Sequence, residues 1–137
     1  MNEQKGEFRK LLNVPLSELD PRRPVTVESD ITTKAAIALM NEERIGALCV
    51  VDDGKVVGIF TERDVLTKVV GREDLSELPL RDVMTEAPGT LPAEATAAEA
   101  LDMMVTGGYR HIPLVDSTQK LVGMISIRDL VEYLADL

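Results

Sequence analysis

The feature that most constrains the fold is an internal repeat with a period of 64 to 65 residues. Residues 58–64 read GIFTERD, and residues 123–129 read GMISIRD. Further upstream, matched positions include Thr26 with Thr90 and Met40 with Met104. A unit of this length that occurs only twice is more typical of two halves of one pseudo-symmetric domain than of a solenoid, which usually needs three or more units.

Each copy predicts the order strand, helix, strand, strand, helix, which is an α+β fold. The first copy is expected to begin with a strand at residues 25–27 and a helix capped by Thr32. A tight hairpin of residues 47–51 and 56–60 should follow, and then a closing helix at residues 62–70 that ends at Gly71. The second copy is expected to contain a helix that begins at a capping box formed by Thr96 and Glu99 and ends at Gly107-Gly108. Strands at residues 112–115 and 121–125 and a closing helix at residues 128–135 should follow. Each half is therefore expected to contain a three-stranded sheet.

The repeat also divides the chain into segments. We expect an N-terminal extension at residues 1–13, helical around residues 8–12, a first repeat at 14–71, a linker at 72–77 and a second repeat at 78–137. Residues 72–80 are interpreted as a polar connection.

Composition limits the classes of partner and of chemistry. The formal charge of −9 argues against nucleic acid or an anionic membrane as the main partner. Because no apolar stretch is long enough to span a membrane and the N-terminus lacks a signal-peptide core, we expect a cytoplasmic protein. One cysteine, Cys49, and one histidine, His111, cannot form a zinc ligand set. Cys49 lies in an apolar run, which favours a small buried side chain over a redox role.

The repeated motif suits recognition of a ribose. A carboxylate in the first turn of a helix, here Asp64 or Asp129, can accept hydrogen bonds from two vicinal hydroxyls. Thr61 and Ser126, three residues earlier, offer hydroxyl and backbone donors to a phosphate. The alternative is that both pairs only cap the closing helices, where Thr, Ser and Asp are preferred in any case.

The ordered motifs of both copies, from the PVTV strand through the capped helices to GIFTERD and GMISIRD, resemble a pair of CBS (cystathionine-beta-synthase) domains forming a stand-alone Bateman module. The resemblance covers residues 14–137. It implies two halves related by a pseudo-twofold axis, with clefts that bind an adenosine-containing regulatory ligand. AMP is the first candidate, and ADP, ATP, NAD and S-adenosylmethionine are alternatives. The resemblance also implies a homodimer, a regulated protein partner, and neither catalysis nor a prosthetic group.

The resemblance assigns residues to two clefts. The Asp64 cleft would comprise Thr26, the backbone of Ile45, Gly46 and Ala47, Thr61 and Asp64, and would receive Arg110 and His111 from the second half. The Asp129 cleft would comprise Thr90, the backbone of Tyr109, Arg110 and His111, Ser126 and Asp129, and would receive Gly46 and Ala47. Because the two cations approach the Asp64 cleft, phosphate-bearing ligands are expected to prefer it.

Other basic residues leave alternatives open. Arg63 and Arg128 would pair with a ligand phosphate or with neighbouring carboxylates. Arg22 and Arg23 would reach a polyphosphate tail at the Asp64 cleft or form a solvated turn. For the whole chain, the alternative to a ligand sensor is a ligand-independent dimerisation scaffold. An enzyme has no support, because the sequence carries no activated nucleophile, metal ligand set or glycine-rich phosphate loop.

Overall fold

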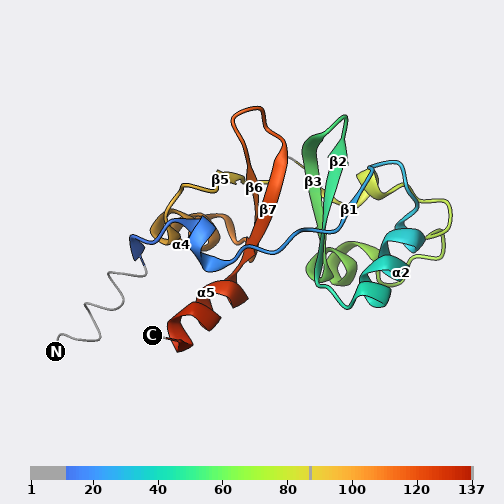
Figure 1. The fold of residues 1–137 in the computed structure, drawn as a ribbon. Helices are drawn as coiled ribbons and strands as arrows, with labels where there is room; N and C mark the ends of the chain where they lie inside the picture. The colour runs from blue at the N-terminus through green and yellow to red at the C-terminus, as the bar shows by residue number, and fades with distance from the viewer. Residues whose placement is uncertain (1–11, 87, 137) are drawn as a thin grey trace. The chain divides into compact units, whose positions relative to one another are not determined.

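The computed structural model describes residues 12–86 and 88–136 (Figure 1). The predicted helix around residues 8–12 therefore lies almost wholly outside the described residues. The chain divides into two compact units. The first unit is Pro24–Pro88, and the second unit combines the described residues before Pro24 with those from Gly89 onward. The predicted repeat boundaries stay a prediction, because these units follow contacts rather than sequence similarity.

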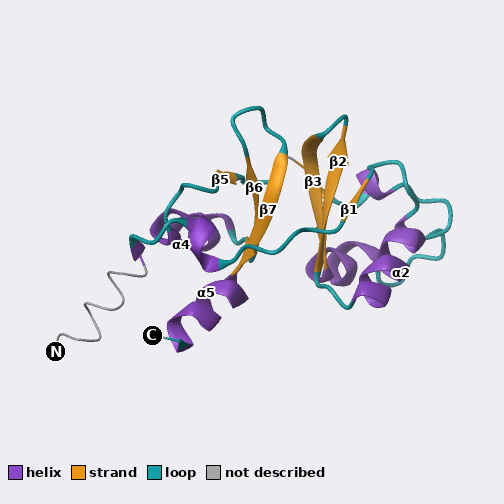
Figure 2. Cartoon of the chain, in the orientation of Figure 1, coloured by secondary structure: helices purple, strands orange, loops and turns teal. Residues whose placement is uncertain are grey.

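The first unit contains a four-stranded sheet in the order β1-β2-β3-β4, of which Figure 2 labels β1, β2 and β3. Its strands are β1 (Thr26–Val27), β2 (Ala47–Asp52), β3 (Lys55–Thr61) and β4 (Thr85–Glu86). β1 runs parallel to β2, and the other pairs are antiparallel. The tight β2-β3 hairpin is confirmed, with positive φ at Asp53 and Gly54. β4 is a strand that the sequence pattern does not predict.

Helices of the first unit begin and end close to the predicted residues. Helix α2 (Thr33–Glu43) is capped by Thr32, whose side chain accepts a hydrogen bond from the Ala35 amide. The closing helix starts as α3 (Glu62–Asp64) and continues as a π-helix, Val65–Val69. The sequence predicts the extent of this segment but not its π-helical geometry.

The core of the first unit is aliphatic apart from Phe60, as the composition predicts. Phe60, Leu48 and Leu80 are fully buried. Leu78, 7% exposed, packs in the same cluster. The interpretation of residues 72–80 as a polar connection is therefore wrong at the C-terminal end of this segment. Leu78 and Leu80 are buried there and complete the core of the first unit.

The second unit repeats this architecture with a three-stranded sheet, β5 (Leu91–Pro92), β6 (His111–Val115) and β7 (Leu121–Ser126). Its helices are α4 (Ala97–Gly107), capped by Thr96 and ended by Gly108, and α5 (Ile127–Ala135). A short 3-10 helix, Leu16–Leu19, contributes two buried leucines to the core of this unit. Arg22 forms an isolated antiparallel bridge to Met124 on β7. The segment that precedes the first strand in sequence thus belongs structurally to the second unit.

Candidate functional site

The repeated motif lies in each unit where a strand passes directly into the closing helix. Thr61 caps α3: its hydroxyl accepts a hydrogen bond from the Asp64 amide at 3.3 Å. In return, Asp64 Oδ2 accepts hydrogen bonds from the Thr61 amide at 2.9 Å and from the Thr61 hydroxyl at 3.1 Å. The proposed N-capping role is therefore confirmed for this pair as a reciprocal capping box.

The second motif has the same geometry. Asp129 Oδ2 accepts hydrogen bonds from the Ser126 amide at 2.7 Å and from the Ser126 hydroxyl at 3.0 Å. The Asp129 amide donates to the Ser126 hydroxyl at 3.3 Å. Asp64 and Asp129 are both buried, at 5% and 6% exposure. In both motifs the cap engages Oδ2, so Oδ1 decides what else each carboxylate can bind.

The start of the neighbouring strand is tied to each motif. Ala47 pairs with Thr61 across β2 and β3, and His111 pairs with Ser126 across β6 and β7. One residue earlier, the Gly46 carbonyl accepts a hydrogen bond from the Glu62 amide, and the Arg110 carbonyl accepts one from the Ile127 amide, both at 3.0 Å. The backbone predicted to contact an adenine therefore lies beside the hydroxyl and carboxylate of the same repeat.

The remaining residues predicted for the two clefts lie at or just before the starts of strands. Thr26 is exposed and pairs with Cys49, whereas Thr90 is half-buried and immediately precedes β5. Tyr109 packs against the core of the second unit, and Ile45, also half-buried, donates its amide to the Met40 carbonyl.

Both motif arginines are exposed. Arg128 Nε lies 3.3 Å from Glu132 Oε1, as the neighbouring-carboxylate alternative expects, and its pairing with a ligand phosphate stays a prediction. The roles of Arg63, and of Arg110, His111, Gly46 and Ala47 in the cleft of the other half, stay predictions.

Asp64 Oδ1 is engaged by two side chains that the sequence reasoning missed. The Thr85 hydroxyl, on β4, donates to it at 3.0 Å. The Lys68 ammonium lies 3.0 Å from the same oxygen. Lys68 follows Asp64 by four residues, a spacing that indicates an ion pair on one face of a helix. Lys68 lies outside the repeated motif, which ends at Asp64.

Asp129 Oδ1 has a different environment. Arg22 Nε lies 3.6 Å away, which is an ion-pair distance beyond the usual range of a hydrogen bond, and the Arg22 side chain is 65% exposed. Tyr133 stands four residues after Asp129, where the first repeat has Lys68 after Asp64. Arg22 therefore lies beside Asp129 of its own unit, and its exposed side chain agrees with the solvated alternative, whereas its reach to the Asp64 cleft stays a prediction.

Thr85 and Arg22 occupy equivalent places in the two units. Thr85 pairs with Ile59 on β3, and Arg22 pairs with Met124 on β7, two residues before Thr61 and Ser126 respectively. A glycine on each motif strand permits this approach. A Cβ added at Gly58 would lie 2.9 Å from the Thr85 carbonyl oxygen, and one added at Gly123 would lie 3.4 Å from Pro21 Cβ.

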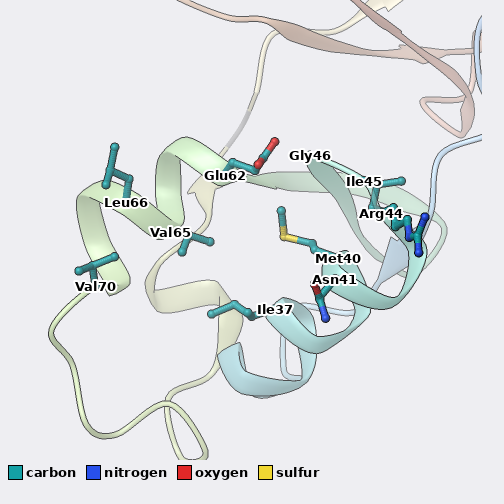
Figure 3. Close-up of a pocket in the computed structure, with 10 residues that line it drawn as sticks. All are labelled: Ile37, Met40, Asn41, Arg44, Ile45, Gly46, Glu62, Val65, Leu66 and Val70. Carbon is teal, nitrogen blue, oxygen red and sulfur yellow. The ribbon is translucent and has the colours of Figure 1, made fainter.

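A pocket of about 550 Å³ opens in the first unit between α2 and the closing helix (Figure 3). Its lining is mostly aliphatic, with Asn41, Arg44 and Glu62 as polar members. It shares Ile45 and Gly46 with the predicted adenine contacts, whereas Thr61 and Asp64 do not line it. Leu66 and Val70, which line its helical wall, are 72% and 69% exposed.

Other sequence-based expectations can be compared with the structure. Cys49 is fully buried, and this burial raises the pKa of its thiol to about 12, which confirms the buried small side chain. Within residues 12–86 and 88–136, no group of three or more His, Cys, Asp or Glu side chains is placed to hold a metal ion. In the same part of the chain, each helix is too short or too polar to cross a membrane.

The CBS domain family matches the chain twice, at residues 16–71 and 80–136. The chain belongs to the CBS domain family. The predicted family and the α+β fold of tandem CBS repeats are therefore confirmed. A protein with CBS domains from Burkholderia ambifaria is 36% identical, with a TM-score of 0.77 and 85% of each chain covered. A CBS domain protein from Pyrobaculum aerophilum, solved as a complex with AMP, is 26% identical, with a TM-score of 0.78, 90% of this CBS pair and all (100%) of that chain covered.

Curated relatives differ in length. An uncharacterised 17.7 kDa protein from Acidianus ambivalens is 34% identical over 122 residues, which cover 88% of this CBS pair and 73% of the relative. The match spans less of longer relatives, such as 21% of a CBS domain-containing protein from Arabidopsis thaliana that is 33% identical. CBS pairs similar to this one thus occur in proteins of very different size.

Proposed function

We propose that this CBS pair is a regulatory module that binds an adenosine-containing nucleotide, with AMP as the first candidate and ADP, ATP, NAD or S-adenosylmethionine as alternatives. The observation that carries the proposal is the pair of buried carboxylates, Asp64 and Asp129, each held by its capping box through Oδ2. Ribose hydroxyls would therefore bind at Oδ1, which Thr85 and Lys68 engage on Asp64 and which Arg22 approaches on Asp129. The AMP complex of the similar P. aerophilum protein supports the same ligand class.

In each repeat, the strand entrance would contact the base and the helix start would contact the sugar and phosphate. The proposed residues of the first repeat are Thr26, Ile45, Gly46, Ala47, Thr61, Arg63 and Asp64. Those of the second are Thr90, Tyr109, Arg110, His111, Ser126, Arg128 and Asp129. The carboxylates bind hydroxyls, and the arginines neutralise phosphate charge. Binding then regulates a partner protein by shifting the populations of two conformations, without catalysis.

The second candidate is a ligand-independent scaffold. Both capping boxes are complete without a ligand, and this observation favours a purely structural role for the motif. Isothermal titration calorimetry with AMP, ATP, NAD and S-adenosylmethionine separates the candidates. Saturable heat with at least one of them supports the sensor, whereas no heat with any of them supports the scaffold.

The module is further proposed to form a homodimer. Its closing helices carry exposed apolar side chains, which are costly to leave in water: Leu66, Val70, Val131 and Leu134. A second copy of the chain could cover these faces with closed twofold symmetry.

A further inference from the structure

We propose that the two carboxylate sites are unequal: Lys68 and Thr85 occupy the Asp64 site from within the chain, and nucleotide loads the Asp129 site, where Arg22 selects for an anionic group. This inference rests on the proposed function. It names the site that binds the nucleotide and the residue that selects for its anionic group. It reverses the order expected from the sequence, in which Arg110 and His111 favour the Asp64 cleft.

The first step concerns Asp64. Its Oδ2 is used by the cap, while Thr85 and Lys68 each lie 3.0 Å from Oδ1. A ribose hydroxyl would have to replace a hydroxyl donor and an ammonium donor that are already in place. It would exchange existing charge-assisted hydrogen bonds for similar ones, so the exchange yields little net affinity.

The second step concerns Asp129. Tyr133 stands where an equivalent of Lys68 would be, and Arg22 stands where an equivalent of Thr85 would be. The Arg22 guanidinium is mostly exposed, and its 3.6 Å separation from Oδ1 is a loose contact. A ribose hydroxyl at Oδ1 therefore displaces less from Asp129 than from Asp64.

The third step concerns the anion. Arg22 is positioned by two backbone hydrogen bonds with Met124, at 3.0 and 3.2 Å, so the start of its side chain is fixed beside the site while its guanidinium is exposed. A guanidinium can bind two phosphate oxygens at once. Arg22 thus suits a phosphate attached to a sugar whose hydroxyls bind Asp129.

The fourth step is the helix that follows each carboxylate. The Asp129 motif opens α5, a regular helix of 9 residues, whereas the Asp64 motif opens an α-helical segment of 3 residues that turns into a π-helix. A regular helix aligns more peptide dipoles toward its N-terminus, and this favours an anion there. The helix geometry therefore points to the same site as the side chains.

Calorimetry with AMP and adenosine tests the inference on matched variants. Wild type is expected to bind one AMP per chain. Asp129→Asn is expected to weaken AMP at least tenfold, and Asp64→Asn to leave AMP within twofold of wild type. Both variants retain a carbonyl oxygen for the cap. Arg22→Gln is expected to weaken AMP about tenfold and adenosine less than twofold. Arg81→Gln, at an exposed arginine outside both proposed sites, is the matched control and should change neither.

The converse variant opens the first site. Lys68→Met combined with Thr85→Val removes both internal donors, and the expected stoichiometry rises from one AMP per chain toward two. An unchanged stoichiometry, or loss of AMP binding in Asp64→Asn but not in Asp129→Asn, overturns the inference and leaves the proposed function standing. No binding of any adenosine ligand to wild type overturns the proposed function itself.

Photolabelling covers the case in which Asp129→Asn fails to fold. Wild-type protein irradiated with 8-azido-AMP is digested, and the labelled peptides are identified by mass spectrometry. Label is expected on peptides from residues 89–136 and to be competed by AMP. Competed label confined to residues 24–86 overturns the inference.

Discussion

Lys68 Nζ lies 3.0 Å from Asp64 Oδ1, one helical turn beyond the carboxylate that the repeated motif marks for a ligand. The Lys68 side chain is 40% exposed, whereas that of Asp64 is 7% exposed. The ion pair therefore joins a buried anion to a cation at the surface. This pair, rather than the motif itself, distinguishes the two repeats.

The first prediction concerns this pair. Lys68→Met should lower the free energy of unfolding by about 1 kcal/mol, because the buried Asp64 carboxylate loses its cation while the exposed lysine end contributes only a screened interaction. Urea denaturation measures the change. Arg128→Gln, which breaks the exposed pair with Glu132, is the control and should cost less than about 0.5 kcal/mol. Equal losses in both variants would contradict the role given to burial.

The second prediction concerns the ribose. AMP that lacks both ribose hydroxyls should bind about 2–4 kcal/mol more weakly than AMP, since two charge-assisted hydrogen bonds to a carboxylate are lost with partial compensation by water. Titration of wild type with AMP and with 2′,3′-dideoxy-AMP measures the difference. Equal affinities would show that the carboxylates do not hold the sugar.

The third prediction compares two glycines of the motif strands. Gly58→Ala should destabilise the protein by about 1–3 kcal/mol, because its Cβ would lie 2.9 Å from the backbone oxygen of Thr85. Gly123→Ala should cost less than about 1 kcal/mol, since its Cβ would meet Pro21 at 3.4 Å, an ordinary contact distance. Thermal and urea unfolding of both variants would reveal the order, and the reverse order would refute it.

The fourth prediction concerns Cys49. Burial raises the pKa of its thiol to about 12, so at pH 8 the folded protein should react with a thiol reagent far more slowly than the urea-unfolded protein. Between the unfolded-state pKa, near 9, and the folded-state pKa, the folded state retains a proton that the unfolded state releases. The contribution of this group to stability is therefore intact below about pH 9 and declines as pH rises toward 12. Cys49→Ala should lack this part of the alkaline decline.

The fifth prediction concerns assembly. Light scattering at micromolar concentration should give the mass of a dimer for wild type. Leu66→Lys with Val70→Lys should shift the mass toward a monomer, because both side chains are exposed on the closing helix of the first unit and two buried lysines would oppose association. Val122→Lys, at an apolar strand residue that is 53% exposed, is the matched control and should remain dimeric. A monomeric wild type would remove the proposal.

The sequence predicts most of the elements because each leaves a local signal. Thr32 and Thr96 mark helix starts, Gly108 marks a helix end, and the apolar runs around Leu48 and Leu114 mark buried strands. The sequence does not predict β4 because a strand of two residues is too short to show an alternation of apolar and polar side chains. The π-helix escapes prediction because it differs from an α-helix in hydrogen bonding rather than in which residues are apolar.

The candidate site is predictable only in part, for a different reason. Thr61, Asp64, Ser126 and Asp129 are found from the repeat because their partners are three residues away in sequence. Thr85 and Arg22 reach the same carboxylates from distant segments. Arg22 immediately precedes the first repeat's strand yet belongs to the second unit. Its position beside Asp129 therefore could not be found from proximity in sequence.

The backbone bridge between Arg22 and Met124 has a consequence for dissecting the protein. An expression fragment that starts at the sequence boundary of the second repeat would omit Leu16, Leu19 and Arg22. The core of that fragment would have a gap, and the outer side of β7 near Met124 would present unpaired amide and carbonyl groups, a surface prone to aggregation. The compact second unit is thus discontinuous in sequence, because it combines residues before Pro24 with those from Gly89 onward.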